Sequence, residues 1–327
     1  MTSTSKHSFE RSRRISLRTK LAFSAGSVEE AMVGAASFAT MLFYNQVLGL
    51  SASLCGVVFL IASVVDGVSD PIVGAFSDRF KSRWGRRHPL MLFSALPLAI
   101  SFYCLYQPPD GLTETGLFGW FLTFMVLMRT AKTFYTVPHA ALGAEMTEDY
   151  HERTSIFGYN SVIGMIAGIG FSLLILLVIF PSTPDYSNGL LDESRYFFLA
   201  AFGALVIIAS LFVCTFGTRD QIPYLHQPPP RQIRFKEYFD EIWKLLCNRS
   251  YIAVCVSWLV ISASIGILNV VSTYTYIYAF ELSTEQLTIA RFVSLPGILI
   301  VLPLSVYLTK LFDKKRTLIC ATLVTAF

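Results

Sequence analysis

Long apolar stretches alternate with shorter polar segments along the whole chain. A window of about 20 apolar residues is long enough to cross the hydrocarbon core of a bilayer as a helix. The pattern predicts a ninth span that begins near Leu318, and eight complete spans that cover residues 22–48, 53–76, 89–108, 117–144, 156–180, 194–217, 250–280 and 286–309. The predicted fold class is therefore an all-α, polytopic membrane protein.

The composition excludes the soluble classes of protein. Hydrophobic residues make up 54% of the chain and charged residues only 15%, whereas about 25% of a typical soluble domain is charged. The net charge of +4 does not argue for a nucleic-acid partner, because the placement of Lys and Arg around the spans is more informative than their sum. The six cysteines contain no CxxC pair, so we interpret them as small hydrophobic residues.

Basic residues concentrate in alternate polar segments. Lys and Arg are frequent before residue 21, between the second and third spans, in the stretch 219–249 and after residue 309, and they are scarce in the intervening loops. An excess of Lys and Arg marks cytoplasmic loops. The N-terminus is therefore predicted to be cytoplasmic, in the plasma membrane or, for a prokaryotic source, the bacterial inner membrane.

The longest polar stretch divides the chain into parts. It contains three prolines at 228–230 followed by an amphipathic run at 235–246, which is typical of a linker and a surface helix. We predict a basic N-terminus (1–20), a six-helix bundle (21–217), a cytoplasmic linker (218–249) and a partial second bundle (250–327). Six plus six helices is the plan of major facilitator transporters. We expect about four more helices beyond Phe327; the alternative is a naturally short and inactive chain.

Two carboxylates lie inside the second apolar window, at Asp66 and Asp70. A charged side chain at membrane depth costs roughly 3 kcal/mol on insertion scales. Residues four apart share one face of a helix. That face must meet water, a cation or an opposite charge, so the pair indicates that the protein handles ions across a membrane.

The segment 66–89 reads DGVSDPIVGAFSDRFKSRWGRRHP and resembles the glycoside–pentoside–hexuronide:cation symporters. The runs TVP at 136–138 and EMTEDYHERT at 145–154 extend the resemblance, which covers the chain from about Lys20 onward. The resemblance implies a major facilitator fold, cation-coupled symport of a small organic solute by alternating access, and no enzymatic activity. It implies no cofactor other than the coupling ion, H⁺ or Na⁺.

In the resembling family, carboxylates at the positions of Asp66 and Asp70 bind the coupling cation, together with a helix-four group matched here by Thr133. Glu30 matches a sugar-binding carboxylate, and Glu29 stands where a lysine is usual. The family's other sugar-site residues are replaced, by Thr136, Ala140 and Ser161. The resemblance therefore does not imply galactoside transport.

The fourth span offers bases of its own. Arg129, Lys132, Thr133 and Thr136 have the spacing of one helix face. Two bases inside a span need anionic partners, and the available carboxylates are Glu29, Glu30, Asp66 and Asp70. We expect one charge network in the central cavity, with Glu29, Glu30, Arg129 and Thr136 as candidate substrate-binding residues.

Lys132 changes the expected coupling ion. An ammonium beside Asp66 and Asp70 would neutralise the carboxylates as Na⁺ does. We therefore favour H⁺ as the coupling ion, with Na⁺ at this pair as the alternative. Arg129 could grip a carboxylate or phosphate of an acidic substrate bidentately; alternatively, both bases only balance the four carboxylates.

The loop after the second span resembles the major facilitator signature that clips cytoplasmic helix ends together. Its candidate gating residues are Gly74, Asp78, Arg79, Gly85, Arg86 and Arg87. Gly74 is expected to permit close helix packing, and Asp78 to accept hydrogen bonds from helix-end amides or from Arg side chains. The acidic segment 145–153 is the expected partner of the arginines. The alternative is a simple topogenic basic loop.

Other functions remain as alternatives. Lysolipid symporters share the two-aspartate motif, and a wide apolar cavity would favour such a cargo over a glycoside. A membrane enzyme or sensor is a third alternative, but the sequence contains no nucleophile–base spacing, phosphate-binding loop or metal cluster to support it. Expected partners are a small-molecule solute (a sugar, glycoside or organic anion) and membrane lipid, without nucleic acid, for a monomeric protein. The tyrosines at 274, 276 and 278 are interpreted as an interfacial belt.

Overall fold

The computed structural model describes residues 14–80, 82–225 and 247–293, and over these ranges the chain is helical without strands. The predicted all-α class is thus confirmed. The main helices are α2 (Leu17–Ser24), α3 (Ser27–Leu42), α4 (Ala52–Arg79), α5 (His88–Leu105), α6 (Glu114–Glu145), α7 (Tyr150–Leu174), α8 (Tyr196–Gly217), α10 (Arg249–Tyr274) and α11 (Thr284–Phe292). Short π turns η1 (Phe43–Val47), η2 (Ile175–Ile179) and η6 (Thr275–Ala279) extend α3, α7 and α10, and 3₁₀ turns lie at η3 (Gly189–Leu191), η4 (Glu193–Arg195) and η5 (Arg219–Tyr224).

Five helical segments of the described ranges are long and apolar enough to cross a membrane. They are Ala52–Arg79, His88–Leu105, Tyr150–Ile179, Glu193–Gly217 and Arg249–Ala279. The 32-residue α6, which carries two bases, packs between α4 and α5. The predicted ninth span, most of the eighth and the amphipathic run 235–246 lie outside the described residues.

The first predicted span is not one continuous helix. α2 ends at Ser24 and α3 begins at Ser27. At Gly26 a Cβ atom would lie 2.0 Å from the Tyr135 hydroxyl and 2.6 Å from Nε2 of His139, so the chain passes α6 where no side chain fits. Glycine also weakens a helix intrinsically. The predicted span over 22–48 thus contains the end of α2, a break at Ala25 and Gly26, and α3 with its extension η1.

Side-chain caps mark where several helices begin. The Thr113 side chain accepts a hydrogen bond from the amide of Gly116, and Asp149 does so from Glu152. Ser283 forms a capping box with Gln286 at the start of α11. These caps satisfy amides that the first turn of a helix leaves without partners.

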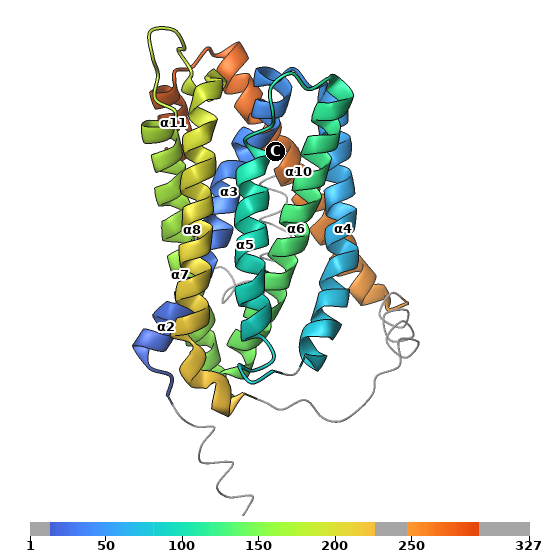
Figure 1. Cartoon of the computed structure of the whole chain (residues 1–327), viewed down its shortest axis with the longest axis vertical. Helices are drawn as coiled ribbons and strands as arrows, with labels where there is room; N and C mark the ends of the chain where they lie inside the picture. The colour runs from blue at the N-terminus through green and yellow to red at the C-terminus, as the bar shows by residue number, and fades with distance from the viewer. Residues whose placement is uncertain (1–13, 81, 226–246, 294–327) are drawn as a thin grey trace, which may run out of the picture.

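The helices stand side by side in a bundle (Figure 1). α3 packs on α7 and α8, α5 on α6 and α8, and α4 on α6. Stacked rings fill the core near η1, where Tyr44 lies 3.7 Å from Phe121 and Phe43 lies 4.0 Å from Tyr196 between ring centroids. The outer side of α4 exposes an apolar stripe made of Leu60, Val64, Val68, Ile72 and Phe76. An apolar outer surface is typical of a multi-pass membrane protein.

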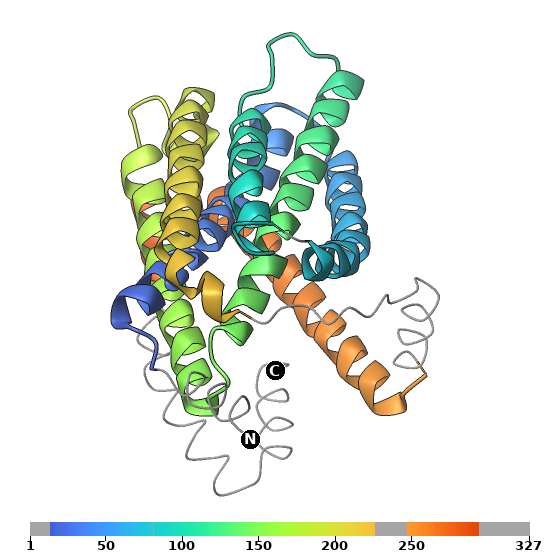
Figure 2. The same ribbon diagram turned by 60° about the horizontal axis from the view of Figure 1, so that its bottom comes forward.

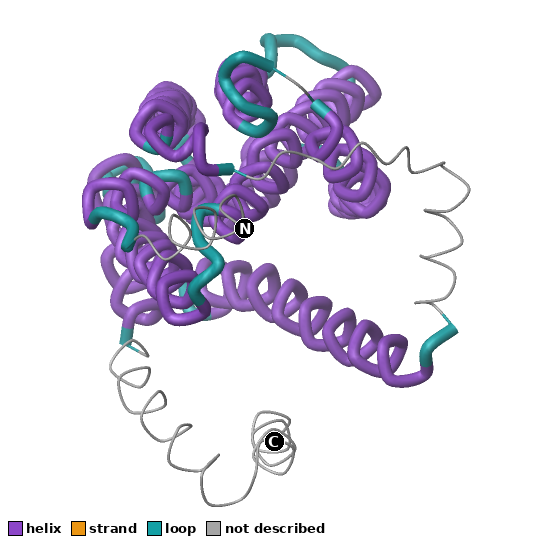
Figure 3. The backbone as a smooth tube through the Cα atoms, turned by 90° about the horizontal axis from the view of Figure 1, so that it is seen from below, coloured by secondary structure: helices purple, strands orange, loops and turns teal. Residues whose placement is uncertain are grey.

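Helix α10 runs obliquely to the bundle. Its first turns lie away from the other helices (Figure 2), and the same separation is visible from below (Figure 3). Within the described ranges its main helix contact is with α3. The later end of α10 and its extension η6 therefore join this helix to the bundle.

Hydrogen bonds fasten that end. The Tyr274 hydroxyl donates to Oδ1 of Asn45 over 2.9 Å, and the Tyr278 hydroxyl donates to Oε1 of Gln46 over 2.5 Å. We call these two bonds the outer contacts. An interfacial belt is therefore an incomplete interpretation of the tyrosines, because two of them bond to η1. Beside them, the Ser182 hydroxyl donates to Oε2 of Glu285 over 2.7 Å.

Candidate functional site

Asp66 and Asp70 both face α6. Nη1 of Arg129 donates to Oδ2 of Asp66 over 2.8 Å, and the Thr133 hydroxyl donates to Oδ1 of Asp70 over 2.9 Å. The Ser69 hydroxyl lies 3.3 Å from that of Thr133. Two successive turns of α4 thus meet two successive turns of α6. One carboxylate is neutralised by a guanidinium, and the other lies among hydroxyl groups.

Lys132 forms its ion pair on α3. Its ammonium is 3.6 Å from Oε1 of Glu30, and its charge also acts on Asp66 of α4. Consecutive residues of a helix point about 100° apart, so Lys132 faces α3 while Thr133 faces α4. The expected network contains two ion pairs, Asp66 with Arg129 between α4 and α6 and Glu30 with Lys132 between α3 and α6. The Lys132 charge connects them, because it also acts on Asp66 and Glu29.

Arg129 has a charge partner of its own. Its ion pair with Asp66 leaves the two side chains 34% and 26% exposed. This geometry agrees with the alternative in which the bases balance the carboxylates, because the guanidinium already donates to a protein carboxylate.

Glu29 and Glu30 face different surroundings. Glu29 is fully buried, whereas the Glu30 side chain is 67% exposed. The Thr136 hydroxyl donates to the Lys132 carbonyl within its own helix over 3.1 Å. Glu29, Glu30 and Thr136 line a cavity of about 170 Å³ together with Gly26, Ser27, Tyr135, His139, Ala140, Phe157 and Asn160. The sequence named both acids as candidates but did not indicate that Glu29 would be buried and Glu30 exposed.

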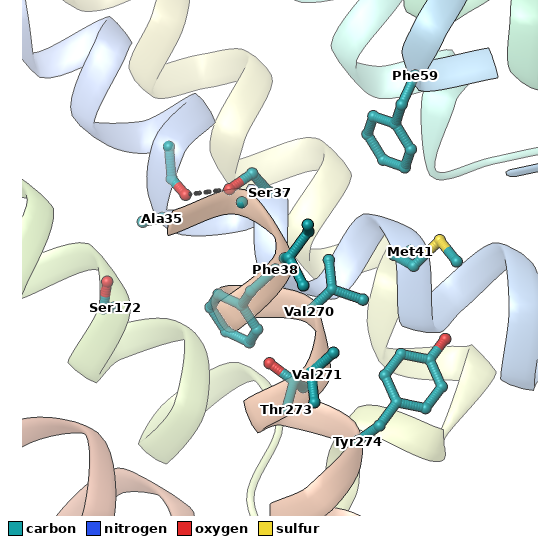
Figure 4. A pocket seen from close by; sticks show the side chains of 13 residues that line it. Ala35, Ser37, Phe38, Met41, Phe59, Ser172, Val270, Val271, Thr273 and Tyr274 are labelled. Carbon is teal, nitrogen blue, oxygen red and sulfur yellow. Dashed lines mark hydrogen bonds between the residues drawn. The ribbon is translucent and has the colours of Figure 1, made fainter. Parts of the chain in front are cut away.

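A larger cavity of about 700 Å³ lies between the bundle and α10. Most of its walls are apolar, with Phe38, Met41, Phe59, Val270 and Val271 around it (Figure 4). Its polar side chains are Ser37, Ser172, Thr273 and Tyr274. These residues come from α3, α4, α7 and α10, and no sequence motif joins them. Only the folded arrangement could identify the cavity.

The basic loop between α4 and α5 closes on the end of α6. The side chains of Arg86 and Arg87 both donate to Oε1 of Glu145, and Nε of Arg87 donates to Oε2 of Glu145 over 3.1 Å. Nη2 of Arg87 also donates to Oδ1 of Asp78 over 3.2 Å. We call these four side chains the inner clasp. Asp78 was expected to accept hydrogen bonds from helix-end amides or from Arg side chains, and in the structure its partner is Arg87.

The other gating candidates, Gly74, Arg79 and Gly85, are not part of the inner clasp. Gly85 has φ +78°, a conformation that favours glycine. At Gly74 a Cβ atom would lie 3.6 Å from Cγ1 of Val137 on α6, an ordinary contact distance, so a small side chain would also fit there. Arg79 is exposed at the end of α4.

The rest of the acidic segment has other partners. Oε1 of Glu152 lies 2.9 Å from the Lys20 ammonium of α2, and Asp149 caps α7. Accepting the Glu152 amide lowers the pKa of Asp149 below its ordinary value. Within 145–153, Glu145 is thus the acid that the inner clasp uses.

Several known proteins are similar in sequence to this chain. The inner membrane symporter YicJ of Escherichia coli is 28% identical over 226 residues, which are 66% of this chain and 46% of that protein. A glucuronide carrier protein homolog of E. coli is 24% identical over 316 residues, 95% of this chain and 66% of the relative. The sodium-dependent lysophosphatidylcholine symporter 1 of Gallus gallus is 28% identical over 160 residues, 47% of this chain and 30% of its own.

The chain spans roughly a third to two thirds of the length of these relatives. They are named as symporters or a carrier, not as enzymes, and the resemblance to the glycoside–pentoside–hexuronide:cation symporters is confirmed. A family profile described as MFS/sugar transport protein matches residues 22–327. The chain therefore belongs to the MFS/sugar transport protein family, within the major facilitator superfamily.

Proposed function

We propose that the protein is a secondary active transporter that couples a cation gradient to symport of a small organic solute by alternating access. The observation that carries the proposal is the meeting of Asp66 and Asp70 with Arg129 and Thr133 between two membrane helices. Charged side chains are retained at such depth where they serve an ion or substrate pathway. The names of the relatives, symporter and carrier, support the same activity.

H⁺ is the favoured coupling ion. Arg129 donates to Asp66 and balances its negative charge in this structure. Among the described residues, Asp70 accepts a hydrogen bond from the Thr133 hydroxyl and forms no ion pair, so a Na⁺ ion would find one carboxylate here that is not already neutralised. A carboxylate that gains and loses a proton needs no further ligands. Na⁺ at Asp66 and Asp70 is the alternative, and the name of the chicken relative supports it.

The favoured cargo is a glycoside, uronide or related solute. The E. coli glucuronide carrier homolog supports this class, and the ion pair of Glu30 with Lys132 supplies polar groups near the surface of α3 and α6. A lysolipid is the second candidate. The apolar walls of the 700 Å³ cavity favour a cargo with an apolar part.

The surrounding architecture follows the same proposal. The protein is a multi-pass membrane protein, and we place its N-terminus in the cytoplasm of a plasma or inner membrane from the distribution of basic loops. The division into 1–20, 21–217, 218–249 and 250–327, and a monomeric state, belong to this proposal. Glu29, Glu30, Arg129 and Thr136 remain the candidate substrate residues, and the inner clasp is the candidate gate.

Uptake into proteoliposomes tests the function and its coupling ion. The chain is reconstituted, and uptake of radiolabelled methyl glucuronide and of lysophosphatidylcholine is followed at fixed pH with and without Na⁺. We expect glucuronide accumulation that an imposed proton gradient drives without Na⁺. Strict dependence on Na⁺ would exclude H⁺ coupling. Accumulation of the lysolipid alone would show that the cargo is a lysolipid and not a glycoside or uronide. Gradient-independent leakage of both solutes would contradict symport itself.

A further inference from the structure

One buried carboxylate lies apart from both ion pairs. Glu29 of α3 is 0% exposed, and neither of its carboxylate oxygens has a hydrogen-bond partner among the residues that the structure describes. Lys132, whose charge acts on Glu29, already pairs with Glu30 over 3.6 Å. Burial of an ionised carboxylate without hydrogen bonds is costly. Glu29 therefore requires a proton, water molecules or a bound group.

The cavity in front of Glu29 limits what that group can be. Its volume is about 170 Å³, enough for roughly five waters at about 30 Å³ each. Pockets for organic ligands usually exceed about 300 Å³, so a glycoside does not fit in this conformation. Oδ1 of Asn160, another side chain lining the cavity, is also buried and has no hydrogen-bond partner in the described part of the chain. The space suits water and a proton.

Every helix packed around the cavity contributes to its electrostatics. The titratable or charged groups are Glu30 from α3, Lys132, Tyr135 and His139 from α6, and Cys214 from α8, and the lining residues of α7 are Phe157 and Asn160. Nε2 of His139 donates to the Phe23 carbonyl over 2.9 Å, and its ring stacks on Phe23 at 4.2 Å. His139 is thus fixed by packing, which leaves Glu29 as the carboxylate without a partner.

We propose that Glu29 and its cavity form a proton-binding site of this chain, distinct from the Asp66–Asp70 pair. The inference rests on the proposed symport and names a second group that carries a proton in it. A hydronium ion in the cavity water gives its proton to a Glu29 carboxylate oxygen, where an O–H bond forms, and the hydronium becomes water. Release is the reverse step, with water accepting the proton.

Glu30 and Lys132 connect this site to the surface. Glu30 lines the same cavity and its side chain is 67% exposed, so the cavity reaches the surface of the part of the chain that the structure describes. While Glu29 is ionised, the Lys132 ammonium is attracted by two carboxylates. Once Glu29 is protonated, the ammonium binds Glu30 alone. The protonation state of Glu29 therefore changes the charge that Glu30 and Lys132 present to a solute.

Infrared difference spectroscopy tests the proton site without any solute. The full chain in lipid nanodiscs is compared between about pH 9 and about pH 5, a range in which ordinary histidines change charge while ordinary Asp and Glu side chains stay largely ionised. We expect a carbonyl-stretch band of a buried protonated carboxyl at the lower pH. Glu29→Gln should remove this band, whereas Glu30→Gln, the same change at the next residue, should retain it.

A second variant covers a failure of Glu29→Gln to fold. Asn160→Ala keeps the acid and removes its polar neighbour, so the band should remain but shift in frequency and in titration midpoint. The inference is overturned if the wild type and Glu29→Gln give the same difference spectrum, or if Asn160→Ala changes neither property. Absence of uptake with the band intact would instead contradict the proposed symport.

Discussion

Arg129 of α6 and Asp66 of α4 form an ion pair of 2.8 Å between Nη1 and Oδ2. Inserting either charged side chain into a membrane without the other would cost free energy. Arg129→Gln leaves the Asp66 carboxylate without a cation. Removing one partner of a buried pair costs about 3–5 kcal/mol, and the partial exposure of these two side chains reduces the loss to about 2 kcal/mol. Thermal unfolding of the purified chain measures it.

The double variant separates the pair from other effects of the substitution. Asp66→Asn with Arg129→Gln leaves two neutral amides, so stability should recover by at least about half of the loss, since the cost lies in the unpaired charge. If the double variant lost as much stability as the two single variants together, the ion pair would not be the cause of the loss.

Gly26 is predicted to tolerate no side chain. In Gly26→Ala the new methyl group meets the Tyr135 hydroxyl and His139, whose rings stack and cannot both move easily. Overpacking of this kind costs about 1–3 kcal/mol, measured as a lowered unfolding temperature. Gly34→Ala, inside α3, is the control, because a Cβ atom there would meet no other described residue within 4 Å. Equal stabilities of the two variants would refute the close approach.

Glu145 is predicted to hold the inner clasp together. Glu145→Gln removes the negative charge that both Arg86 and Arg87 bind, and leaves Arg87, whose side chain is 4% exposed, with Asp78 as its remaining acid in the clasp. The loop between α4 and α5 should loosen, and limited trypsin digestion should cleave it several times faster. Glu114→Gln at the opposite end of α6 should leave the cleavage rate unchanged. Unaltered cleavage in both variants would exclude the clasp as the restraint.

The outer contacts are predicted to protect Cys55. This cysteine is fully buried near η1. In a background with the other cysteines replaced by serine, Tyr274→Phe with Tyr278→Phe removes both hydrogen bonds to η1 and should increase the rate of thiol labelling about tenfold, equivalent to about 1.4 kcal/mol. Tyr276→Phe is the control, because the two bonds come from its neighbours. If the parent protein and both variants are labelled equally slowly, the outer contacts do not protect Cys55.

Much of the fold was readable from the sequence, because membrane helices are specified by length and hydropathy. The charges of α4 and α6 were also expected to meet. The spacing of Lys132 and Thr133 could not reveal which neighbouring helix each faces, since periodicity defines a helix face but not the helix that covers it. Burial of Glu29 beside an exposed Glu30 depends on the rotation of α3, which the break at Gly26 influences. The bonds of Tyr274 and Tyr278 to η1 join residues more than 200 positions apart, and no local pattern encodes them.

The inner clasp and the outer contacts differ in chemistry. The first consists of full charges near an aqueous surface, and the second of uncharged hydroxyl and amide groups. Dissolved ions weaken attraction between charges over a Debye length of about 8 Å at physiological ionic strength, and they leave neutral hydrogen bonds almost unaffected. A rise in ionic strength would thus loosen one end of the bundle and not the other. In the orientation we propose, with the basic loops in the cytoplasm, the salt content of that compartment would bias which end of the transporter opens first.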